Sequence, residues 1–142
     1  MKFHFLKFIL IVLVASLSFS CSSDDDSSEE TSGGSTTTTN TWVKLTVTTS
    51  GGTVKPNYIV MMFDEPVTLT KPLPPIKKQV TTNADGLAYF DLNSMITSST
   101  PKTYYFEVFV ANGSDSYTLK SITHYNVKLA KGTMATSSII VN

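Results

Sequence analysis

The chain has 142 residues, enough for one ordinary domain and too few for two. Its 11 basic and 11 acidic side chains cancel, and every basic one is a lysine. This argues against a nucleic-acid-binding protein, which usually carries a basic excess and contacts phosphates and bases through arginine. The single cysteine and two histidines exclude an internal disulfide, a cysteine-based zinc site and a metal site built on several histidines.

The first twenty residues have the layout of a secretory signal. Lys2 and Lys7 frame the start, residues 8–15 are all apolar, and small residues then lead to Cys21. The apolar run is too short to cross a bilayer, which takes about 20 residues. We therefore expect residues 1–20 to be a cleaved signal peptide; a buried N-terminal helix is the alternative interpretation.

The end of this signal resembles the lipobox of bacterial lipoproteins, in the stretch Leu17-Ser18-Phe19-Ser20-Cys21. The resemblance implies that the chain is cut before Cys21 and that this residue is acylated. Two or three acyl chains hold a protein stably on a membrane, whereas one does not. An ordinary signal peptide with a leftover cysteine is the alternative, but a free thiol is unusual in a secreted protein.

An acidic cluster follows directly, and its residues are Ser22, Ser23, Asp24, Asp25 and Asp26. A cluster at this place resembles the export signal of Bacteroidota surface lipoproteins. The resemblance implies a protein anchored on the outer face of the outer membrane through membrane lipid. In the alternative interpretation these residues only keep a tether solvated.

Residues 21–41 are predicted to be a lipidated cysteine and a disordered acidic tether. Residues 22–41 carry five acids, no lysine and no apolar side chain larger than the methyl group of threonine. Such a segment cannot bury enough surface to offset the entropy of ordering it. About 20 flexible residues span roughly 25 Å. Residues 42–142 carry nine lysines and six acids, so the tether and the domain differ in the sign of their charge.

From Trp42 onward the composition favours β-strands. Alternating and continuous apolar patterns predict strands at 42–49, 58–63, 76–82, 87–92, 103–111, 117–129 and 134–141, with a short edge strand at 67–70. Gly86 is expected to supply a positive φ in a hairpin that joins the third and fourth of these. No segment has helical periodicity with caps. The pattern predicts an all-β fold, an antiparallel sandwich of seven or eight strands over residues 42–142.

The segment Thr81-Thr82-Asn83-Ala84-Asp85-Gly86-Leu87-Ala88-Tyr89-Phe90 is similar to the T-x-x-D-G-x-x-x-F hairpin of transthyretin-like and carboxypeptidase-regulatory-like domains. The ending, residues 127–133 and 139–141, is similar to the last two strands of that family. Residues 43–47 and 58–63 fit its opening hairpin. The resemblance implies a prealbumin-like, Ig-like sandwich with no shared catalytic residues, which in many members stabilises, spaces or binds.

Few residues are candidates for catalysis or metal binding. His124 is the one histidine after the signal, but it lies out of phase with the apolar face of its segment and no G-x-S-x-G motif accompanies it. Asp64 and Glu65 are adjacent, so in an extended chain they point to opposite faces. Asn83 and Asp85 begin like a calcium loop, but the later oxygen ligands are missing. We expect no catalytic residue, no metal and no other cofactor.

Aromatic side chains are the remaining candidates for binding. Those with polar strand neighbours, and therefore able to lie on an outer face, are Trp42, Tyr89, Tyr105 and Phe109. Exposed rings of this kind stack on sugars or dock a partner protein; packing between the sheets is the alternative.

Together these features predict a non-enzymatic outer-membrane surface lipoprotein that acts as an accessory or interaction module, with no nucleic-acid partner. Its expected partners are membrane lipid, through acylated Cys21, and an outer-membrane protein complex. The alternative is a carbohydrate-binding module that captures glycans through exposed aromatics. A small hydrolase that uses His124 is a third and weaker hypothesis.

Overall fold

A computed structural model describes residues 39–142 with the exception of residue 115. The predicted signal peptide, Cys21, the acidic cluster and most of the tether lie outside the described residues. Regular structure in the described part of the chain consists of strands alone. Accordingly, no helix among these residues has the length and apolarity to cross a membrane.

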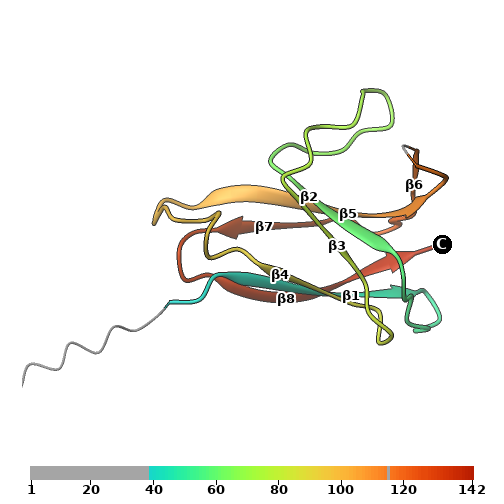
Figure 1. The fold of residues 1–142 in the computed structure, drawn as a ribbon, viewed down its shortest axis with the longest axis horizontal. Coiled ribbons are helices and arrows are strands. Elements are labelled where there is room, and N and C mark those ends of the chain that lie inside the picture. Colours follow the sequence, from blue (N-terminus) through green and yellow to red (C-terminus); the bar gives the residue numbers. More distant parts are fainter. Residues whose placement is uncertain (1–38, 115) are drawn as a thin grey trace, which may run out of the picture. The chain divides into compact units, whose positions relative to one another are not determined.

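Eight strands form two sheets that pack face to face (Figure 1). The smaller sheet contains, in spatial order, β4 (Leu87–Asp91), β1 (Trp42–Thr49) and β8 (Met134–Val141). The larger sheet contains β3 (Lys78–Thr81), β2 (Ile59–Phe63) and β5 (Lys102–Ala111), and then β6 (Tyr117–Leu119) and β7 (Tyr125–Leu129), which pair with opposite halves of β5. The predicted all-β sandwich is confirmed, with eight strands.

The main core lies between the two sheets. Val43, Leu45 and Val47 alternate along β1 with polar residues, and all three are fully buried because successive strand residues point to opposite faces. Phe90 of β4 meets Phe106 of β5 edge to face, with ring centroids 5.2 Å apart. Burying one such side chain contributes about 1.5–3 kcal/mol relative to leaving it exposed.

A second, smaller cluster covers the outer face of the larger sheet. Its buried members are Met61, Phe63 and Phe109, and Val67 from the loop after β2 packs against them. Both faces of β2 are therefore buried, which explains why its sequence is a continuous apolar run rather than an alternating one. Within the segment 67–70, Val67 takes part in this cover, residues 68–70 are exposed, and the segment is not the predicted edge strand.

Strand pairing departs from the prediction in three places. β1 pairs with β8 in parallel, the one parallel pairing among these strands, and with β4 instead of forming an opening hairpin with β2. β3 and β4 belong to different sheets, so the turn between them crosses from one sheet to the other and does not close a hairpin. The segment 117–129 is interrupted at 120–124, where Ser121 forms a bridge with Val141 of β8.

Gly86 does adopt the expected positive φ, of 70°. Its backbone also sits against other chain segments, because its carbonyl accepts a 2.8 Å hydrogen bond from the amide of Val47. A Cβ at this position would lie 2.8 Å from the Val47 carbonyl oxygen and 2.9 Å from the Lys55 amide nitrogen. The turn between the sheets therefore requires glycine for both conformation and space.

The residue just before β1 is packed into the domain. Thr41, assigned to the tether from sequence, is fully buried. Its amide donates to Asn93 Oδ1 at 2.7 Å and its hydroxyl accepts from the amide of Gly132 at 2.8 Å. The described members of both core clusters lie between Val43 and Val141, so this part of the chain carries a hydrophobic core of its own, and we expect it to fold on its own.

Candidate functional site

The four candidate aromatic residues fall into two groups on opposite outer faces. Trp42 and Tyr89 lie on the three-stranded sheet, whereas Tyr105 and Phe109 lie on the five-stranded one. Phe109 is only 3% exposed and Tyr105 is half-buried against the same cluster. Phe109 thus lies on an outer face, as its strand phase allows, but it is not exposed, because Val67 from the loop after β2 packs against its cluster.

Trp42 and Tyr89 form an exposed aromatic pair. The register places Lys44 directly opposite Tyr89 and Trp42 opposite Asp91, so the two rings are diagonal neighbours on adjacent strands. Their centroids are 6.0 Å apart and their planes are inclined by 35°. Tyr89 is 51% exposed and Trp42 is half-buried, so the pair offers ring surface to solvent while its base packs on the sheet.

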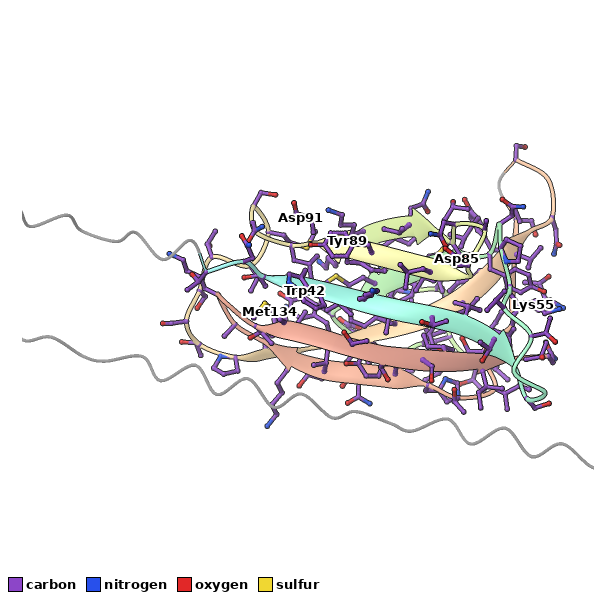
Figure 2. The ribbon with its side chains drawn as sticks, turned by 90° about the horizontal axis from the view of Figure 1, so that it is seen from below. Trp42, Lys55, Asp85, Tyr89, Asp91 and Met134 are labelled. Carbon is purple, nitrogen blue, oxygen red and sulfur yellow. The ribbon has the colours of Figure 1, made fainter. Side chains whose placement is uncertain are left out.

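Polar and flexible side chains surround this pair. Met134 is opposite Trp42 on the other side, in the parallel register with β8, and is 62% exposed. Figure 2 shows Trp42, Tyr89, Asp91 and Met134 gathered at one end of the sheet, from three adjacent strands. We call this surface the aromatic face, and its residues are Trp42, Lys44, Tyr89, Asp91, Met134 and Thr136.

The Asp91 carboxylate is held in place at the edge of the aromatic face. Its Oδ1 atom accepts hydrogen bonds from the amide and the side-chain nitrogen of Asn93, at 3.0 and 2.9 Å. Lys78 Nζ donates to the Asp91 backbone oxygen at 2.5 Å. The face thus places a fixed carboxylate and the Lys44 ammonium beside two rings, which suits a ligand with an apolar surface edged by hydroxyl groups.

His124 contacts a residue that sequence reasoning did not single out. Its Nδ1 atom lies 2.8 Å from Oε1 of Glu107, whose side chain is buried while the imidazole is largely exposed. The second oxygen, Oε2, is buried with no hydrogen-bond partner in the structure. The signal for Glu107 was a single charged residue within an otherwise aromatic and apolar stretch, residues 104–110.

This pair does not extend to a serine among the described residues. The hydroxyl of Ser121, three residues before His124 in sequence, accepts a 2.7 Å hydrogen bond from the backbone amide of Val108. This bond gives the Val108 amide a partner at the interruption between β6 and β7, next to Glu107 on β5. The described bonds therefore give His124 the role of covering a buried carboxylate at this break.

Asp64 joins two lysines in an ion cluster, whereas the neighbouring Glu65 is exposed. Asp64 Oδ2 lies 3.0 Å from Lys77 Nζ and 3.1 Å from Lys102 Nζ. The hydrogen bond from Lys77, followed by that from Lys102, holds the pKa of Asp64 below its ordinary value against the opposing effect of burial. The same carboxylate raises the pKa of Lys102. The cluster ties the end of β2 to the start of β5.

The calcium-like segment is a turn. Asn83 Oδ1 accepts hydrogen bonds from the amides of Asp85 and Leu87, at 3.0 and 2.9 Å, which is the geometry of an Asx turn. Within residues 39–114 and 116–142, no group of three or more histidine, cysteine or acidic side chains is placed to hold a metal ion.

Neither a protein-family model nor a curated protein matches this sequence. The functional argument therefore depends on the geometry of the described residues and on the sequence signals that precede them.

Proposed function

We propose that this chain is a lipid-anchored surface protein and that its β-sandwich is a non-enzymatic accessory module, which binds through the aromatic face. The observation that carries the proposal is the exposed pair of Trp42 and Tyr89 on a sheet face that also carries Lys44 and Asp91. Exposed aromatic surface edged by polar side chains is characteristic of interaction sites. On the outer face of the larger sheet, Phe109 is buried and Tyr105 is half-buried, and the exposed Tyr117 packs edge to face on Phe109.

The anchor is supported by the lipobox-like stretch and by the acidic cluster after Cys21. Replacing Cys21 by Ser should move the protein from the membrane fraction to the soluble fraction, since the acylated thiol is the expected attachment point. A Cys21→Ser protein that still fractionates with membranes would contradict this part of the proposal.

Crosslinking on intact cells, with the chain tagged at Asn142, tests the binding module. The wild-type chain should give an adduct with a neighbouring molecule, and Trp42→Ala should remove it. Tyr117→Ala is the matched control, because Tyr117 is an exposed aromatic on the other sheet. Loss of the adduct in both variants, or in neither, would show that binding does not depend specifically on the aromatic face.

Glycan binding is the second candidate function, and the geometry of Trp42, Tyr89 and Asp91 favours it. Two rings beside a fixed carboxylate and an ammonium supply both stacking surface and hydrogen-bonding groups for a sugar ring. Glycan-array screening of a soluble form of residues 36–142 should then give binding that Tyr89→Ala weakens about tenfold and Tyr117→Ala leaves unchanged. An array with no binding would exclude this candidate and leave a protein partner.

A further inference from the structure

A cavity of about 290 Å³ opens between the β4–β5 connection and the adjoining ends of β5 and β7. It shares no residue with the aromatic face. Ile96 and Leu129, both buried members of the main core, line it together with Tyr104. The walls formed by these three residues are therefore largely apolar, and packing in the main core holds them in position.

Hydrogen bonds hold the connection that forms the cavity rim. The amide of Ile96 donates to the carbonyl of Leu92 at 2.8 Å, and the amide of Lys131 donates to the carbonyl of Ser98 at 2.7 Å. The second bond ties the rim to the turn between β7 and β8. The cavity is thus a formed feature of the fold, as small-molecule sites usually are.

The rim carries hydroxyl groups and one ammonium group that can donate hydrogen bonds to a ligand. Ser98 Oγ accepts the amide hydrogen of Thr100 at 3.0 Å, so the hydroxyl hydrogen of Ser98 is available to a ligand. Lys102 is the one charged residue among those that line the cavity. Its Nζ atom donates to Asp64 at 3.1 Å and lies 5.5 Å from the centroid of the Tyr104 ring, which leaves ammonium hydrogens for a second acceptor.

We propose that this cavity binds a small monocarboxylate with an apolar body, whose carboxylate accepts hydrogen bonds from Lys102 and Ser98 while its body lies on Ile96 and Leu129. The volume is near the lower end of the range of about 300–1,000 Å³ for small-molecule sites, so a single small acid fits better than a chain of sugars. Charge-assisted hydrogen bonds to the ammonium give the site its preference for an anion. This site does not depend on the aromatic face or on the lipid anchor.

The proposal can be tested by titrating a soluble form of residues 36–142 with phenylacetate while the amide chemical shifts are measured by NMR. Phenylacetate should shift amides of residues 95–102 and Leu129 saturably, with a Kd on the order of 1 mM. Phenylacetamide, which has the same shape without the charge, should bind about tenfold more weakly. Shifts centred on Trp42 and Tyr89 instead would assign phenylacetate to the aromatic face and overturn the proposal.

Two lysine variants provide a matched comparison. Lys77 and Lys102 both contact Asp64, but Lys77 does not line the cavity. Lys102→Gln should weaken phenylacetate binding about tenfold or more, and Lys77→Gln by less than about twofold. Equal weakening by both, equal affinity for phenylacetamide, or no saturable shift would each overturn the proposal.

Discussion

At the scale of single residues, the domain depends on a few positions where backbone or charge is tightly constrained. Gly86, Glu107 and Asp64 are three of them, and each has a different physical basis. Gly86 meets the backbone of two other segments, Glu107 is a buried carboxylate with one partner, and Asp64 is shared by two ammonium groups.

Gly86→Ala should destabilise the domain by about 3 kcal/mol, because the added Cβ is strained at φ 70° and meets backbone atoms. Gly52→Ala is the control: Gly52 has φ 82°, but nothing lies within 4 Å of an added Cβ. Its cost should be about 1 kcal/mol, from conformational strain alone. Urea unfolding measures both, and equal losses would contradict the close approach at Gly86.

His124→Ala should destabilise the domain by about 1–3 kcal/mol, because it removes the partner of the buried Glu107 carboxylate. In a Glu107→Gln background the same change should cost less, because the buried group is then uncharged. Urea unfolding of the four proteins gives the coupling between the two residues. A cost for His124→Ala that is independent of residue 107 would show that the contact adds nothing.

The lowered pKa of Asp64 predicts that the free energy of unfolding depends on pH, and it also fixes the sign of that dependence. The folded state favours the ionised carboxylate, so the stabilisation is complete above the ordinary Asp pKa of about 4 and is lost as pH falls through the lower folded value. The wild type should exceed Asp64→Asn by less than about 1 kcal/mol at neutral pH, because solvent screens the pair. Unfolding measured from pH 7 to acid pH should show this advantage decreasing below about pH 4; a constant difference would contradict it.

At the scale of the elements, periodicity in the sequence predicts the strands but not their partners. The alternation in β1 and the pattern over 134–141 locate two strands correctly, because one face of each is buried. That these two strands pair in parallel depends on contacts between residues far apart in the sequence, which the alternation does not encode. The turn at Gly86 was predicted correctly, whereas its hairpin was not, since the same turn residues serve a connection between sheets.

The candidate site was predicted in part for the same reason. Outward positions for Trp42 and Tyr89 follow from strand phase, and their adjacency follows only from the pairing of β1 with β4. Phe109 has the correct phase for an outer face, but the loop after β2 covers it. The partnership of Glu107 with His124 depends on the break between β6 and β7, which no residue pattern marked.

The covered outer face gives a prediction for two aromatic truncations. Phe109→Ala should cost about 3–5 kcal/mol because it empties the second cluster, whereas Tyr89→Ala should cost less than about 1 kcal/mol because half of its surface is already exposed. Urea unfolding distinguishes the two. Similar losses would mean that the two outer faces are not packed as described.

At the scale of the whole molecule, the sequence places a proposed lipid anchor before a sandwich that has a core of its own and an exposed aromatic face. The central claim is that this face is occupied on the cell. Hydroxyl-radical footprinting of intact cells, compared with the soluble form of residues 36–142, tests it most directly. Met134 and Tyr89 should be protected on cells and reactive in the soluble form, while Tyr117 and Leu69, which are also exposed, should react equally in both. Equal reactivity of Met134 and Tyr89 in both samples would contradict the claim.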